Sequence, residues 1–122
     1  MNDISEWPTD KLTALRLGRR LVAEVPATRT GHRAFVDVTP GQTLRDSEAH
    51  GQGWVCGDAD RAFRLEHWEY DAELMDGFDY DIGAVLVASA EAAGEGELMA
   101  TLIAWQLDPR RFAYPWNTED PK

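Results

Sequence analysis

The apolar positions near the N-terminus recur with the period of an amphipathic helix. Leu17 and Leu21 fall on one face when successive residues are placed about 100° apart, as on a helix that packs against a core. Thr9 can cap the first turn, because its hydroxyl accepts a hydrogen bond from a free backbone amide. Pro26 ends the pattern, since proline cannot continue a helix. We therefore predict a helix over residues 10–24.

Five later segments are rich in the aromatic, β-branched and other apolar residues that favour strands, and turn residues separate them. Together with the helix they predict an α+β fold, with one N-terminal amphipathic helix packed on a mainly antiparallel sheet of about five strands. The whole chain is expected to form one domain, with residues 1–8 and 117–122 flexible. The predicted strands are His32–Val38, Trp54–Cys56, Phe63–Asp71, Val85–Ala88 and Leu98–Leu107.

The apolar face changes sides within the predicted strand Phe63–Asp71. Phe63 and Leu65 point to one face of a regular strand, whereas Trp68 and Tyr70 point to the other. Two explanations are open. A β-bulge beside His67 resets the alternation, or the strand contacts apolar material on both faces.

The last two predicted strands are apolar on both faces and are expected to form a hairpin around a turn at residues 93–96. Strands of this kind usually lie in the middle of a sheet that is covered on both sides. The cover of the second face requires more chain or a second subunit, so a structural or accessory protein that forms a homodimer is a further alternative. A helix over residues 84–93 is the other alternative, because alanine favours helices.

Composition indicates a small soluble protein. The chain has 122 residues, of which 43% are hydrophobic, and no apolar run approaches the ~20 residues of a membrane span. Its first residues lack the basic and apolar regions of a signal peptide. Cys56 is the one cysteine and has no partner for an internal disulfide. These features together predict a cytoplasmic protein.

Charge is concentrated in the middle of the sequence. The formal net charge is −10, and residues 46–109 alone carry fifteen acidic and two basic side chains. Such a surface repels nucleic acid phosphates and anionic membranes. It attracts a basic protein surface and speeds encounter with it. We therefore expect a basic protein partner and no direct binding of nucleic acid or membrane.

The stretch 58–81 has nine carboxylates, with the aromatic residues Trp68, Tyr70, Phe78 and Tyr80 lying between them. Protein interfaces favour aromatic anchors within a polar rim, so this stretch suits a surface that pairs with arginines and lysines. We predict an inhibitor, or an immunity or antitoxin-like protein, that occludes a basic cleft such as that of a nuclease or other toxin. The predicted partner-binding residues are Asp58, Asp60, Glu66, Glu69, Asp71, Glu73, Asp76, Asp79, Asp81, Trp68, Tyr70, Phe78 and Tyr80.

An alternative hypothesis is a small-molecule-binding protein or a small enzyme. His67, Glu69 and Asp71 project from one face of a regular strand, and one histidine with two carboxylates suits acid–base chemistry or a hard metal ion. Convergence of the three side chains into a concavity would favour this hypothesis. A flat, outward array would favour partner binding.

Other candidate chemistry is weak. The acids around Gly77 lack the spacing of a calcium-binding EF-hand loop. Cys56 lies in a short apolar segment that is typical of an inert core cysteine. No serine lies in a nucleophile-elbow pattern, and no glycine-rich phosphate loop or zinc spacing is present. We expect no catalytic residue, no metal ion and no cofactor.

Overall fold

The structure is a computed structural model that describes residues 7–43, 48–49, 51–53, 61–75, 83–118 and 120. Within these residues four strands form one antiparallel sheet in the order β1-β2-β3-β4. The α+β class is confirmed, with four strands in the described residues where we predicted about five. The strands are β1 (Leu21–Val25), β2 (His32–Pro40), β3 (Phe63–Asp71) and β4 (Val85–Ala92). The helices are α1 (Thr9–Arg16), α3 (Glu95–Ala104) and the 3-10 turns η1 (Pro109–Arg111) and η2 (Pro115–Asn117).

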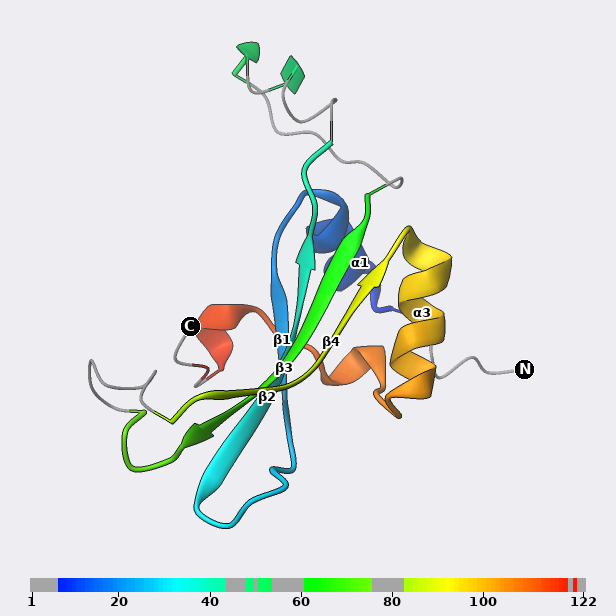
Figure 1. Ribbon diagram of the computed structural model, residues 1–122. Coiled ribbons are helices and arrows are strands. Elements are labelled where there is room, and N and C mark those ends of the chain that lie inside the picture. The colour runs from blue at the N-terminus through cyan, green and yellow to red at the C-terminus, as the bar shows by residue number, and fades with distance from the viewer. Residues whose placement is uncertain are drawn as a thin grey trace.

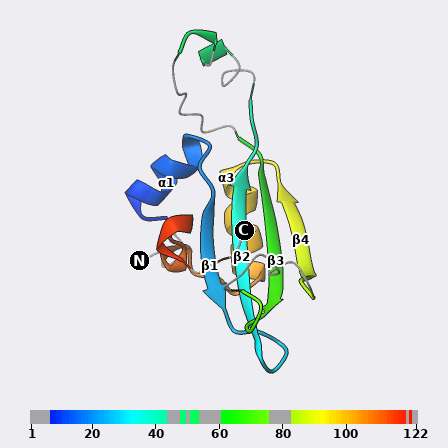
Figure 2. The ribbon, with the colours of Figure 1, turned by 90° about the vertical axis from the view of Figure 1, so that its left-hand side faces the viewer.

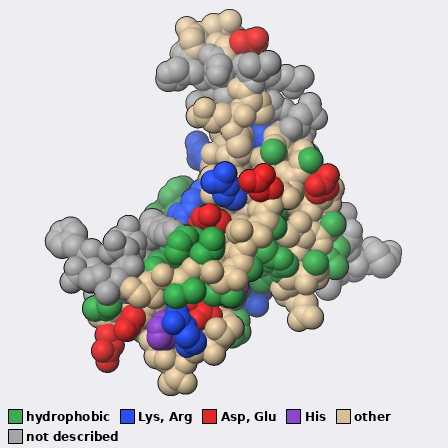
Figure 3. All heavy atoms as spheres, in the orientation of Figure 1, with side chains coloured by type: hydrophobic (Ala, Val, Ile, Leu, Met, Phe, Trp, Pro, Cys, Tyr) green, Lys and Arg blue, Asp and Glu red, His purple; other side chains and the backbone are tan. Residues whose placement is uncertain are grey.

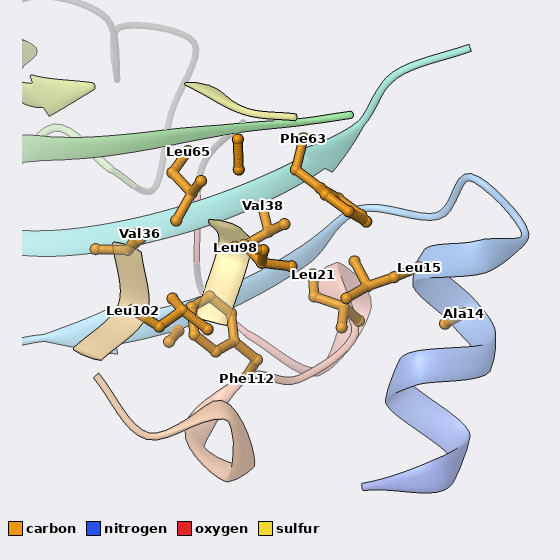
Figure 4. Packing of buried hydrophobic residues seen from close by; sticks show 12 residues of the cluster. Ala14, Leu15, Leu21, Val36, Val38, Phe63, Leu65, Leu98, Leu102 and Phe112 are labelled. Atoms are coloured by element: carbon orange, nitrogen blue, oxygen red, sulfur yellow. The ribbon is translucent and has the colours of Figure 1, made fainter. Parts of the chain in front are cut away.

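One face of the sheet is covered by α3, and α1 lies beyond β1 near one end of the sheet (Figures 1 and 2). The main core lies on this face, where side chains from all four strands meet Leu98 and Leu102 of α3 and Phe112 of the C-terminal segment (Figure 4). Its buried members are Ala14, Leu15, Leu21, Ala23, Val36, Val38, Phe63, Leu65, Ala92, Leu98, Leu102 and Phe112.

The opposite face of the sheet carries a second, smaller apolar cluster. Val22, Phe35 and Tyr70 are buried in it, and Trp68 packs against them. Because β3 contributes to both clusters, it contacts apolar material on both faces, which is the second of the two explanations for its pattern. Its pairing with β2 is unbroken from end to end. An irregularity does occur beside His67, but it lies in the pairing with β4, where Val87 is the extra residue.

The predicted N-terminal helix is too long. Helix α1 ends at Arg16, and Leu21–Val25 forms strand β1. Gly18 has φ +85°, a left-handed conformation that glycine adopts without strain and that a helix cannot contain. Leu21, Val22 and Ala23 are all buried, which requires cover on both faces of the strand. The helical pattern was misleading because a strand covered on both sides has apolar residues at every position.

The predicted hairpin is half wrong. Its first arm is strand β4, but its second arm is helix α3. Leu98 and Leu102 are both buried and lie four residues apart, which is the spacing of one helix face. Leucine, alanine, methionine and glutamate also favour helices. The predicted strand Trp54–Cys56 lies outside the described residues.

The C-terminal segment folds back on the body of the protein. Phe112 is in the core, whereas Trp116 remains 71% exposed and stacks on Tyr114. Ala113 exchanges two backbone hydrogen bonds with Val22 on the outer edge of β1. Asp120, within the segment that we predicted to be flexible, is ion-paired with Arg20.

Replacing Leu102 by alanine should lower the free energy of unfolding by about 2–5 kcal/mol, because the cavity left in the core cannot fully collapse. Its neighbour Ile103 is 61% exposed, so Ile103→Ala should change stability by about 0.5 kcal/mol or less. Urea denaturation of both variants measures the difference. Equal losses of stability in the two variants would mean that α3 packs on the sheet with a different face.

Candidate functional site

Strand β3 separates the two ends of the acidic stretch 58–81. It contains nine residues and runs through the interior of the sheet, so the chain enters and leaves it about 30 Å apart. The described part of the stretch is therefore spread along the sheet and is not gathered on one surface. Seven of the predicted partner-binding residues lie outside the described residues: Asp58, Asp60, Asp76, Phe78, Asp79, Tyr80 and Asp81.

Two of the predicted partner-binding residues are buried within the protein. Tyr70 belongs to the second apolar cluster. Glu69 has no exposed side-chain surface, and its carboxylate accepts hydrogen bonds from the backbone amide and hydroxyl of Thr28, at 2.7 and 2.8 Å. The Arg29 Nε donates to the same carboxylate at 3.2 Å. Glu69 thus fixes the loop between β1 and β2 and is not available to a partner.

Hydrogen bonds and charge also set the protonation of Glu69. Burial by itself would raise its pKa, but the hydrogen bonds from Thr28 and the guanidinium of Arg29 outweigh burial and hold the pKa below its ordinary value. The side chain is therefore a carboxylate at neutral pH, and its negative charge is compensated locally.

The other four predicted residues lie at or near the surface. Glu66 and Trp68 are half-buried on the face opposite α3, and the Trp68 indole donates to the Glu66 carboxylate at 3.2 Å. Asp71 accepts a hydrogen bond from the backbone amide of Glu73 at 3.0 Å, which stabilises the turn after β3. Glu73 itself is exposed. These four residues occupy two separate places, along β3 and beyond its end.

Strand β4 presents an exposed apolar edge. It is the last strand of the sheet, and no other strand among the described residues pairs with its outer side. Val85, Leu86 and Val87 are each 42% exposed. Unpaired backbone donors and acceptors beside exposed apolar side chains make such an edge a site for strand addition. We call these three residues and the free side of β4 the β4 edge.

A hollow of about 690 Å³ lies at the far end of the β4 edge. It is formed where β2 ends, β3 begins and the chain passes from β4 into α3. Three carboxylates and one guanidinium line it, from Glu66, Glu91, Glu97 and Arg64. Arg64 and Glu91 approach to only 3.8 Å and both are largely exposed. We call this region the acidic hollow, because negative side chains outnumber positive ones.

Most acidic side chains of the described body have a basic partner. Glu95 accepts two hydrogen bonds from Arg16, and Glu24 accepts two from Arg33. On the face shown in Figure 3, basic side chains accordingly lie beside acidic ones. The residues outside the described ranges carry nine acidic and two basic side chains, which is most of the net charge of −10. The excess charge therefore belongs to the segments that flank β3 and to the termini.

His67 faces a cavity of about 450 Å³ on the side of the sheet that α3 covers. Its Nε2 atom is buried and has no hydrogen-bond partner among the described residues. Burial lowers the pKa of His67, against the opposing effect of the nearby Glu69 carboxylate. The proposed set does not converge, because Glu69 is occupied by Thr28 and Arg29, and Asp71 by the turn.

A metal site is not formed by the described residues, which contain no group of three histidine, cysteine, aspartate or glutamate side chains close enough to hold an ion. Cys56 lies outside these residues. Sequence reasoning missed Glu91 and Glu97, because they come from a strand and a helix that meet only in the fold. The alternation of Glu91 with buried Ala92 at the strand end was the available signal.

Comparisons of this chain with models of protein families, with curated proteins and with solved structures find no match. Among the described residues, no helix has the length and apolar character needed to cross a membrane.

Glu69→Gln should lower the free energy of unfolding by about 1–3 kcal/mol, because the amide accepts fewer of the hydrogen bonds that Thr28 and Arg29 donate. The matched control is Glu73→Gln, which removes an exposed charge and should have an effect of about 0.5 kcal/mol or less. Urea denaturation at neutral pH compares the two variants. A loss confined to Glu73→Gln would contradict the role assigned to Glu69.

Acidification should destabilise the protein through His67. The folded state binds a proton less readily than the unfolded state, whose histidine titrates near 6.5. The contribution of neutral His67 to the free energy of unfolding is therefore complete above that pH. It is lost as the pH falls towards the pKa of His67 in the folded state. Thermal unfolding measured at about pH 7.5 and about pH 5.5 should show a lower melting temperature at the lower pH. The decrease should be smaller in His67→Gln than in wild type. The control His32→Gln should retain the fall, and an unchanged fall in His67→Gln would refute the assignment.

Proposed function

We propose that this chain is an acidic protein-binding domain that occludes a basic surface of a partner, such as the phosphate-binding cleft of a nuclease or other toxin. The observation that carries the proposal is the β4 edge, an apolar strand side that no described strand pairs with and that leads into the acidic hollow. No residue has a catalytic role in this proposal.

The β4 edge supplies the apolar part of an interface. Val85, Leu86 and Val87 would bury their exposed surface against an extended segment of the partner, whose backbone would bond to the free side of the strand. Because these contacts use the backbone, they supply affinity with little sequence specificity. The specificity must then come from side chains beside the edge.

Acidic side chains lie at one end of the β4 edge. The acidic hollow lies at its end, and the segment 76–82, which carries three aspartates, precedes its start in the sequence. Basic side chains of a partner would meet the carboxylates of the acidic hollow, which favours binding and accelerates encounter. The near balance of charge elsewhere on the described body directs a basic partner to this edge.

A capture experiment tests the proposal. Immobilised chain should retain a basic protein from lysate of its own cells, and a salt gradient should release that protein because exposed charges are screened. Val87→Lys and Glu91→Lys should lose it, since each places a positive charge in the interface. Two matched controls, Ile103→Lys and Asp10→Lys, alter an exposed apolar and an exposed acidic residue elsewhere and should retain it.

Occlusion is tested on the retained protein itself. If it is a nuclease, adding the chain should inhibit its activity on DNA or RNA, and Val87→Lys should not inhibit. The proposal fails if nothing basic is retained, if the controls lose the protein as the edge variants do, or if the retained protein keeps full activity when bound.

A further inference from the structure

The cavity beside His67 has mainly apolar walls. Val25 and Val36 come from β1 and β2, and Trp105 and Leu107 come from the turn that follows α3. Its volume of about 450 Å³ falls within the range of small-molecule sites, which are apolar cavities with a few placed polar groups. It lies on the face of the sheet that α3 covers, away from the acidic hollow.

His67 lines this cavity and carries a polar atom that has no partner among the described residues. Its Nε2 atom is buried without a partner in the described part of the chain. Buried polar atoms in proteins are almost always hydrogen-bonded, and an exception calls for a specific explanation. A neutral imidazole has one donor nitrogen and one acceptor nitrogen. In the tautomer protonated at Nε2, His67 would donate to an oxygen of a bound molecule.

Arg111 supplies a positive charge to the same cavity. One of its nitrogens, Nη2, donates to the Glu24 carbonyl oxygen at 3.3 Å, and a guanidinium has five N–H donors in a planar fork. Such a fork matches the two oxygens of a carboxylate. The Glu69 carboxylate is the negative group near His67, and Arg29 pairs with it, so its charge is compensated.

The wall of the cavity contains a strained residue. Gln106 has φ +59°, a left-handed conformation in a position where helices usually end with glycine. Leu107 donates to the Leu102 carbonyl at 2.8 Å and closes the helix end around it. This conformation brings the consecutive residues Trp105, Gln106 and Leu107 to the cavity together. Strain of this kind is often found at binding sites.

We propose that this cavity binds a small monocarboxylate with an apolar body, either a single aromatic ring or a branched chain. The carboxylate accepts hydrogen bonds from His67 Nε2 and from Arg111, and the apolar body packs against Trp105 and Leu107. The site is independent of the proposed partner interface, because its lining residues differ from those of the acidic hollow.

An NMR titration of the full chain tests the site. Phenylacetate and isobutyrate are the probes, and phenylacetamide is the neutral analogue of the first. Both carboxylates should produce saturable shifts at the amides of His67, Trp105 and Leu107 at millimolar concentration. Phenylacetamide should bind roughly tenfold or more weakly, because a hydrogen bond to a charged group is stronger than a neutral one.

Matched variants locate the site. His67→Leu and Arg111→Met should each weaken phenylacetate binding by roughly tenfold. His32→Leu and Arg110→Met change the same residue types outside the cavity and should leave affinity unchanged. Ala88→Leu fills the cavity from β4 and should abolish binding, while an unchanged fold is verified by the remaining amide signals.

Three results would overturn the proposal. The first is the absence of saturable shifts with either carboxylate. The second is equal affinity for phenylacetamide, which would exclude a charge-specific site. The third is binding that survives Ala88→Leu, which would place the probe elsewhere on the protein. Loss of partner capture in the salt-gradient experiment has no bearing on these outcomes.

Discussion

The position of β3 between β2 and β4, with apolar side chains on both of its faces, is the constraint on which the rest of the structure depends. Phe63 and Leu65 contact the core beneath α3, whereas Tyr70 contacts the second cluster. A strand in this position must be covered on both sides. Helix α3 covers one side, and the second apolar cluster provides contacts for the other.

A buried arginine holds the chain that leads into β3. Arg61, directly before β3, is buried, and its Nε and Nη1 donate to the carbonyls of Arg16 and Gly41 at 2.7 and 2.8 Å. One side chain therefore joins the end of α1, the end of β2 and the start of β3. A buried guanidinium is tolerated because backbone carbonyls accept its hydrogen bonds.

The sequence was sufficient to predict the elements whose periodicity is unambiguous. Alternation and β-branched residues identified β2 and β3, and the two apolar faces of β3 were already visible in Phe63 and Trp68. The length of the first helix could not be predicted, because Leu21 and Val22 satisfy the helix pattern and the two-sided strand pattern equally. For α3, the four-residue spacing of Leu98 and Leu102 was available but was outweighed by the expectation of a hairpin.

The candidate sites were less accessible to sequence reasoning. Composition located the acidic excess, but it could not show that β3 would carry Glu69 and Tyr70 into the interior. The acidic hollow and the His67 cavity each combine residues from three or more elements. Such combinations depend on strand order and register, which no single segment specifies. The local pattern singled out His67 as a candidate, and the structure places this residue at the wall of a cavity.

The C-terminal segment also determines how many partners the sheet can take. Val22 exchanges both of its outward backbone hydrogen bonds with Ala113, and Arg111 donates to the Glu24 carbonyl, so the outer side of β1 is occupied. In the described part of the chain this leaves β4 as the single open edge. Two sheets that each have one open edge leave no free side when they join edge to edge. Growth of this chain into a fibre requires two open edges, so through the described part of its sheet each molecule can pair with one partner strand.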